Sequence, residues 1–237
     1  MGRLFARLLR RDHEVIICSR DEAKAKKIAK RIRVKSGDTS SIPDANIVIV
    51  SVPIEKTVEA CLDVLRHMKS GGLLVEISSV KSSIVNNIAD ALPEGVEYLS
   101  LHPLFGPSVR RLREQILVAI PVRRGRLSEE LLTLLRNRGL IVEHSSIEEH
   151  DKMMALLQVM HHYAYLVMAV ELAKNVETCP DLAKFFTRSF RRTLGQIKSL
   201  SKIRETIISI QKLNLYGLQT RKDYASSAEK LSIMDDK

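Results

Sequence analysis

Residues 73–81 read LLVEISSVK, an apolar run that ends in Ser79 and Lys81. The run at residues 96–107, VEYLSLHPLFGP, ends in a similar way, with His102 where a strand gives way to a loop. In open α/β sheets, ligands bind outside the carboxyl ends of the strands. We therefore expect a serine, a lysine and a histidine at the rim of one crevice. Taken alone, the serines after the first run could instead cap the following helix, and His102 could be an ordinary loop histidine.

Short β-rich runs alternate with helical segments up to residue 145. The expected strands are Glu14–Cys18, Asn46–Ser51, Leu73–Ile77, Val96–Leu101, Ile116–Pro121 and Leu140–Glu143, and the expected helices are Asp21–Ile32, Glu55–Met68, Ser82–Leu92 and Ser128–Arg138. Strands that are nearly continuous in Val, Ile and Leu are typical of a parallel sheet covered on both faces. The pattern predicts a doubly wound α/β fold with a mostly parallel sheet, and Asp21 and Ser128 as helix N-caps.

From residue 146 onward the sequence predicts helices only. Ser146 to Glu149 form a capping box that opens an apolar helix, and further helices are expected at Pro180–Ser199 and Lys202–Leu215, before a polar tail. We therefore expect a dinucleotide-binding domain at 1–145 and an all-helical domain at 146–237. A helix as apolar as Met153–Leu172 must be buried on most sides, which favours a homodimer through the helical domain.

The net charge of +10 suits either a nucleic-acid-binding protein or one that handles a small polyanion. Charge alone does not separate the two, but aromatic residues make up only 4% and no RNA-stacking motif is present, so no nucleic-acid partner is predicted. We expect no membrane-spanning segment and no signal peptide, which indicates a cytoplasmic protein. Three distant cysteines favour neither a disulfide framework nor a metal site, and no metal is predicted.

The first residues already read as the first helix of a dinucleotide-binding unit, because apolar side chains recur along Met1–Leu9. Gly2 would then be the last glycine of a G-x-G-x-x-G turn, whose backbone holds a pyrophosphate. The first strand and two glycines of that unit are absent from the sequence, which would leave the two neighbouring strands without a partner. Of two explanations, we favour a start of the sequence that was assigned too late, at a methionine inside the glycine-rich turn. The alternative is a protein whose dinucleotide binding is compromised by the loss of that turn.

Four further residues are candidates for the cofactor site. A strand ends at Ser19 and Arg20, where an acidic residue would bind the ribose of NAD, and this uncharged and cationic pair instead suits the extra phosphate of NADP. A surface role for Arg20 and use of NAD stay open. Another strand ends in Ser51-Val52-Pro53, at the point where the chain must turn across the cofactor, although the proline could instead be a helix-start signal.

These features together resemble the prephenate dehydrogenase family, most closely its archaeal-type members in tyrosine biosynthesis. The motifs that carry the resemblance are Ser51-Val52-Pro53, Ser79-Val80-Lys81, the segment from His102 to Pro107, Glu149-His150-Asp151 and the segment from Gln158 to His162. The resemblance implies a Rossmann-like nucleotide domain, its first strand absent here, followed by a helical dimerisation domain. It also implies oxidative decarboxylation of prephenate to 4-hydroxyphenylpyruvate.

The resemblance assigns roles to individual residues. His102 would accept the proton of the ring hydroxyl, and Ser79 would hydrogen-bond to that hydroxyl or to the histidine. Arg192, with Arg188 within a turn of it, would bind the substrate carboxylates, and His162 would lie near the substrate. A solvated basic face is the alternative for this arginine cluster.

Ser108 stands where the family often has an acidic residue, which leaves prephenate and the aminated analogue arogenate as alternative substrates. A β-hydroxyacid-type reductase is a second alternative, although Lys174 is poorly placed for the catalytic lysine of such an enzyme. A third is a degenerate, non-catalytic nucleotide-binding protein.

Overall fold

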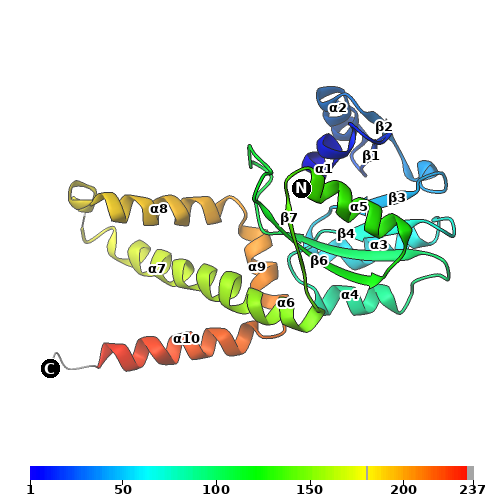
Figure 1. Ribbon diagram of the computed structural model, residues 1–237. Coiled ribbons are helices and arrows are strands. Elements are labelled where there is room, and N and C mark those ends of the chain that lie inside the picture. The colour runs from blue at the N-terminus through cyan, green and yellow to red at the C-terminus, as the bar shows by residue number, and fades with distance from the viewer. Residues whose placement is uncertain (180, 234–237) are drawn as a thin grey trace. The chain divides into compact units, whose positions relative to one another are not determined.

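The computed structural model describes residues 1–179 and 181–233, and its contacts divide the chain into two compact units, Met1–Ile147 and Glu148–Lys237. The strands of the first unit are β1 (Ile16–Cys18), β2 (Lys35–Gly37), β3 (Ile47–Val50), β4 (Leu73–Glu76), β5 (Glu97–Pro103), β6 (Ile116–Arg123) and β7 (Ile141–His144). Its α-helices are α1 (Gly2–Leu9), α2 (Glu22–Ile32), α3 (Thr57–Leu65), α4 (Ser82–Ala89) and α5 (Arg126–Asn137). Figure 1 shows these elements in sequence colours.

The strands form a five-stranded sheet in the order β3-β4-β5-β6-β7 and a separate parallel pair, β1-β2. All neighbours in the larger sheet are parallel except β5 and β6. The predicted α/β fold with a mostly parallel sheet is therefore confirmed. As expected, β1 and β3 are not paired with each other, and each lies at the edge of its own sheet.

The two faces of the larger sheet are covered by different helices (Figure 1). On one face, Phe5 and Leu9 of α1 and the leucines of α5 pack on alternate strand residues, which are Leu73, Val75, Leu99 and Leu101. Successive side chains of a strand point to opposite faces. The residues between them, Leu74, Glu76, Tyr98 and Ser100, therefore face α3 and α4.

The structure differs from the sequence prediction at the start of α5. Ser128 lies inside the first turn instead of capping it, and its hydroxyl donates a hydrogen bond of 2.8 Å to the carbonyl of Gly125. The carboxylate of Glu97, on β5, accepts hydrogen bonds from the backbone N–H groups of Leu127 and Ser128 at 3.0 and 2.7 Å. A carboxylate from strand β5 therefore satisfies two of the backbone N–H groups that have no partner within this helix.

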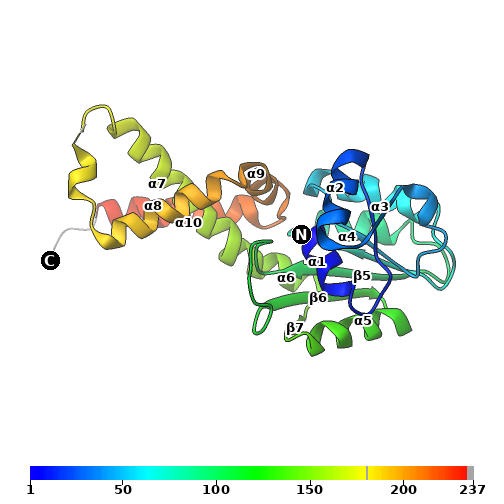
Figure 2. The ribbon, with the colours of Figure 1, turned by 90° about the horizontal axis from the view of Figure 1, so that it is seen from above.

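The described residues of the second unit form helices joined by turns, and none of them lies in a strand. It contains α6 (Ile147–Met154), a π-helical segment η3 (Ala155–Met160), α7 (His161–Asn175), a 3₁₀ turn η4 (Leu182–Phe185), α8 (Arg188–Ser201), α9 (Arg204–Leu213) and α10 (Gly217–Ser232). Figures 1 and 2 show α7 leading into a loop and α8 leading out of it on the same side, so that the two helices have opposite chain directions. The predicted helix start at Pro180 falls outside the described residues, and the polar tail expected after residue 220 is helical up to Ser232.

The expectation that no segment could span a bilayer is wrong by the criteria of length and composition. The continuous helix Ile147–Asn175 is long and apolar enough to cross a membrane, and only 17% of its most apolar window is buried in the structure. One such helix is weak evidence for a membrane span. It does show that a single copy of the chain leaves this helix largely uncovered.

Candidate active site

His102 lies near the carboxyl end of β5, beside the segment that follows β4. Parallel pairing places Glu76 of β4 opposite Ser100 of β5, and His102 lies two residues further along β5, so it projects from the same face as Ser100. His102 pairs with Val118 of the antiparallel strand β6, and its side chain is buried, with an exposed fraction of 2%. The structure therefore places the predicted catalytic imidazole at the edge where β4 and β5 end.

A buried ion pair fixes the turn that carries Ser79. The ammonium of Lys81 lies 2.8 Å from a carboxylate oxygen of Glu76 and donates a hydrogen bond of 2.7 Å to the carbonyl of Leu101, and both charged side chains are fully buried. The hydroxyl of Ser100 donates to the same carboxylate oxygen, and the N–H of Ser78 donates to the other at 2.7 Å. A charged pair that is hydrogen-bonded on all sides has one geometry, so the turn is held rigidly.

This pair corrects the expectation that Lys81 stands at the rim of the crevice. Its side chain turns inward and reaches the backbone of β5, one residue before His102. Ser79 itself is half-buried, between the buried residues Ser78 and Val80. Lysine therefore positions the two strand ends, and the serine and histidine are left as candidates for contact with a ligand.

Two other titratable groups near Glu76 are chemically inert. Burial, reinforced by the charge of Glu76, raises the pKa values of the Cys61 thiol and the Tyr98 phenol. Both groups therefore stay protonated at physiological pH, and a protonated thiol is a poor nucleophile. Among the described residues around this ion pair, neither side chain competes with His102 as a base.

Gly2 and Ser51, both predicted to contact a cofactor, lie together in the structure. The backbone N–H of Gly2 donates a hydrogen bond of 2.8 Å to the hydroxyl of Ser51, immediately after β3. A Cβ atom on Gly2 would lie only 3.1 Å from the Cβ of Ser51, so this close approach favours glycine. A helix start with no side chain in the way fits the pyrophosphate of a dinucleotide.

The other predicted cofactor residues lie after β1 and β3. Ser19 and Arg20 are exposed at the end of β1, where the hydroxyl of Ser19 accepts a hydrogen bond of 3.3 Å from the N–H of Asp21. Pro53 is exposed and precedes a 3₁₀ turn at Ile54–Lys56. The exposed guanidinium of Arg20 is open to an anionic ligand.

In the second unit, His162 follows the π-helical segment of the long helix. The Nδ1 atom of His162 is buried without a hydrogen-bond partner among the described residues, and burial lowers the pKa of the ring to about 4. His162 is therefore neutral at physiological pH and offers an unsatisfied nitrogen. The neighbouring His161 is exposed. A π-helical turn frequently accompanies a functional site, and the sequence did not reveal it.

The arginines of α8 divide into two groups. Arg191 lies 5.7 Å from the ring centroid of Phe186 and is engaged in a cation–π contact. Arg188 and Arg192 are four residues apart, so they share one face of α8, and neither has an ion-pair partner in the part of the chain that the structure describes. This division favours Arg188 and Arg192 over Arg191 as ligands for an anion.

Sequence reasoning singled out His150 and Asp151 as part of a motif, but it missed Gln211 and Asn214, which bond to the same helix. His150 Nδ1 lies 2.8 Å from Asp151 Oδ1, with both side chains fully buried, and the side chain of Asn214 donates to the carbonyl of Asp151 at 2.9 Å. Gln211 donates a hydrogen bond of 2.9 Å to the carbonyl of Val159 in the π-helical segment. Nothing in the local sequence around Gln211 or Asn214 indicates contacts more than 50 residues away.

Comparison with known proteins gives one family match. Residues 5–112 match the family described as "Prephenate dehydrogenase, nucleotide-binding domain". The chain is 30% identical over 184 residues to a "Probable arogenate/prephenate dehydrogenase" from Methanocaldococcus jannaschii, a match that covers 75% of the chain and 41% of the relative. It is 26% identical over 227 residues to the "T-protein" of Haemophilus influenzae, covering 94% of the chain and 56% of that protein. The chain thus spans about half the length of these curated relatives.

Solved structures show the same fold. Prephenate dehydrogenase from A. aeolicus, in complex with hydroxyphenyl propionate and NAD+, matches with a TM-score of 0.80 at 16% identity. The match covers 98% of this chain and 87% of that one. At this identity the likeness establishes the fold alone.

Proposed function

Because this chain belongs to the prephenate dehydrogenase family, we propose that it catalyses the oxidative decarboxylation of prephenate to 4-hydroxyphenylpyruvate with a nicotinamide dinucleotide. The observation that carries the proposal is the position of His102 at the end of β5, beside the rigid turn that contains Ser79. In this proposal, the unit Met1–Ile147 binds the dinucleotide, and the helical unit supplies substrate-binding residues and a dimer interface.

The proposed reaction removes a hydride from the ring carbon that bears the hydroxyl group, and carbon dioxide leaves from the opposite ring carbon. A bound nicotinamide dinucleotide would supply the hydride acceptor. His102 would accept the hydroxyl proton, and Ser79 would hydrogen-bond to the hydroxyl or to the imidazole. The electrons of the broken C–C bond complete the aromatic ring, so the protein needs to orient the substrate and exclude water rather than provide another acid.

NADP is the proposed cofactor, because an exposed Arg20 follows the exposed hydroxyl of Ser19 at the end of β1. A guanidinium can form charge-assisted hydrogen bonds with the 2′-phosphate that distinguishes NADP from NAD. The variant Arg20→Gln should raise the Kd for NADP while leaving the Kd for NAD unchanged. Equal effects on both cofactors would contradict the preference.

The proposed substrate is a dicarboxylate, so its binding requires cations. Arg188 and Arg192 share a face of α8, and the neutral ring of His162 adds an uncharged donor or acceptor. Arg192→Gln should raise the KM for the substrate, whereas Arg191→Gln removes the same charge from the neighbouring position and should change it little. If the Arg191 variant is the one with the raised KM, the anion-binding role belongs to Arg191.

The activity is tested by incubating the purified chain with NADP and either prephenate or arogenate. Absorbance of the reduced nicotinamide and chromatographic detection of 4-hydroxyphenylpyruvate or tyrosine report turnover. Product from prephenate supports the proposal, and product from arogenate alone transfers it to the aminated substrate. No turnover of either substrate by a chain that binds NADP would overturn it and favour a non-catalytic nucleotide-binding protein.

A homodimer is proposed because the long helix Ile147–Asn175 is largely uncovered in one copy. Its exposed apolar residues include Leu156, Leu157, Leu166, Val167 and Val170. The polar residues Gln158, His161 and His162 lie in the middle of the same helix, and such residues are costly inside a bilayer but acceptable in an interface between proteins. A second copy of the chain is therefore favoured over lipid as the cover.

Sedimentation equilibrium tests this proposal directly. The chain should sediment as a dimer, and Leu157→Glu combined with Val170→Glu should shift it toward the monomer, because charges would be buried at the interface. A monomeric wild-type chain would contradict the proposal. Flotation with lipid vesicles would instead identify the helix as a membrane-binding segment.

A further inference from the structure

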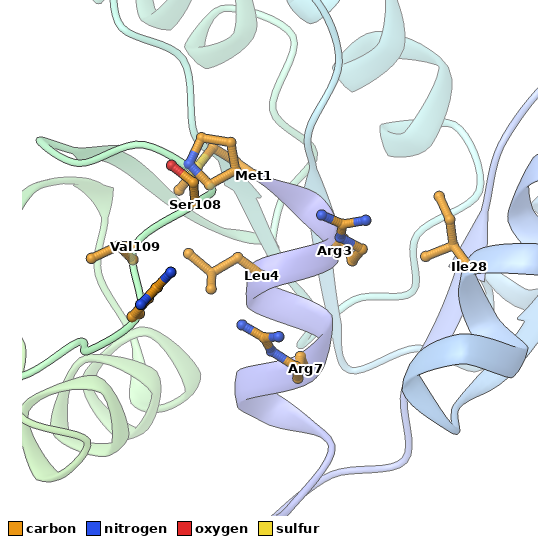
Figure 3. Close-up of a pocket in the computed structure, with 9 residues that line it drawn as sticks. Met1, Arg3, Leu4, Arg7, Ile28, Ser108 and Val109 are labelled. Carbon is orange, nitrogen blue, oxygen red and sulfur yellow. The ribbon is translucent and has the colours of Figure 1, made fainter.

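A cavity of about 630 Å³ lies beside α1. It is lined by residues from α1, by Ile28 of α2 and by the loop at residues 107–110, which follows β5. This volume is within the range of small-molecule sites. The close-up in Figure 3 shows the side chains of Arg3 and Arg7 extending from α1 into this space.

Three arginines line the cavity, and none of its lining residues in the described part of the chain is acidic. Arg3 and Arg7 come from α1, and Arg110 comes from the loop. None of the three forms an ion pair or a side-chain hydrogen bond among residues 1–179 and 181–233, whereas Arg10 bonds a backbone carbonyl and Arg138 pairs with Asp12. The hydrogen-bond donors of all three guanidiniums are therefore unused among these residues.

The spacing of these charges is unfavourable without a counter-ion. Arg3 and Arg7 are four residues apart on a helix, where like charges repel. A guanidinium presents a planar fork of donors that matches carboxylate and phosphate groups in a bidentate manner. A ligand with several anionic oxygens would neutralise all three groups at once, which a single chloride ion cannot do.

We propose that this cavity binds a compact polyvalent oxyanion, bearing phosphate or carboxylate groups, through Arg3, Arg7 and Arg110. The remaining walls include the apolar residues Leu4 and Val109, so the cavity also has room for a small organic body between the charged groups. The site differs from the proposed contact with the cofactor 2′-phosphate, because Arg20 does not line it.

Occupancy of this site would connect two elements that carry the candidate active site. α1 begins at Gly2, which bonds to Ser51, and the loop with Arg110 continues from the strand that bears His102. An anion held by arginines from both elements would tie the loop to the helix. The proposal does not depend on the identity of the reaction, since anion binding is measured without substrate.

Isothermal titration calorimetry with pyrophosphate and with citrate, at constant ionic strength, tests the proposal. We expect saturable binding of at least one anion to the wild-type chain, and the tighter of the two identifies the phosphate or carboxylate class. Arg7→Gln and Arg110→Gln should each weaken that binding about tenfold, the effect of losing a hydrogen bond to a charged group. Thermal unfolding without anion establishes that each variant is folded.

Arg111→Gln is the matched control, because Arg111 is exposed in the same loop, loses the same charge and does not line the cavity. Its affinity should stay within about twofold of wild type. If Arg110→Gln and Arg111→Gln weaken anion binding equally, the loss comes from the overall positive charge of the loop and not from a contact in the cavity. That result would overturn the proposal. The proposal also fails if neither anion binds, or if Arg20→Gln abolishes binding while Arg7→Gln and Arg110→Gln do not.

Discussion

The buried pair of Glu76 and Lys81 makes a quantitative prediction about stability. Lys81→Met removes the ammonium but leaves the carboxylate of Glu76 fully buried, where it still accepts hydrogen bonds from the hydroxyl of Ser100 and the N–H of Ser78. Breaking a buried pair by removing one partner costs about 3–5 kcal/mol of the free energy of unfolding. Since each 1 kcal/mol lowers Tm by roughly 2–4 °C in a chain of this size, Tm should fall by roughly 6–20 °C.

Two further variants identify the cause of that loss. Glu76→Gln combined with Lys81→Met removes both charges, so it should be more stable than Lys81→Met alone. Lys26→Met breaks the ion pair with Glu22, whose side chains are 69% and 68% exposed, and should cost less than about 0.5 kcal/mol. Urea unfolding followed by circular dichroism measures the free energy of unfolding for all three.

Either of two results would contradict the assignment of this loss to an unpaired buried charge. A loss of less than about 1 kcal/mol in Lys81→Met would mean that the carboxylate of Glu76 is not left unpaired in a dry interior. A double variant no more stable than Lys81→Met would mean that lost packing, rather than an uncompensated charge, accounts for the change.

Three other variants test separate features. His102→Asn should lower kcat by about 100-fold in the assay with prephenate and NADP, with the Kd for NADP unchanged, because it removes a positioned proton acceptor. For His162, the folded pKa of about 4 lies below the ordinary 6.5, so the unfolded chain binds the proton more readily and stability should fall as the pH drops from 6.5 toward 4. His162→Gln should make Tm depend less on pH between pH 4 and 6.5. If the slope of Tm against pH is unchanged in this variant, His162 is not the cause of the pH dependence. Glu97→Gln should lower the free energy of unfolding by about 1 kcal/mol, because a neutral amide caps α5 less well than a carboxylate, and urea unfolding would reveal no change if the cap is unimportant.

The elements predicted correctly are those with a strong local pattern. The apolar runs that became β3, β4 and β6 and the recurring leucines of α1 specify their structures without help from the rest of the chain. β2 was missed because Lys35, Ser36 and Gly37 have no apolar alternation, and their strand exists through pairing with β1. Pairing with β1 in the folded protein therefore makes this segment a strand, although its local sequence has no strand propensity.

The candidate site shows the same division. His102 was placed correctly at a strand end, because its position depends on the length of an apolar run. The direction of Lys81 could not be predicted, since it depends on the carboxylate of Glu76 and on a carbonyl of β5, which is adjacent only in the folded sheet. The roles of Gln211 and Asn214 likewise come from contacts between helices far apart in the sequence.

The π-helical segment at Ala155–Met160 has a consequence for insertions and deletions in this chain. A π turn holds one residue more than an α turn, so the helix beyond it keeps its orientation despite the extra residue. Removing the exposed Leu157 would let the segment close into a regular α-helix and leave the ring of His162 facing its present direction. In α6, before the π segment, loss of one residue would rotate every later side chain by about 100° and turn His162 away from its buried position.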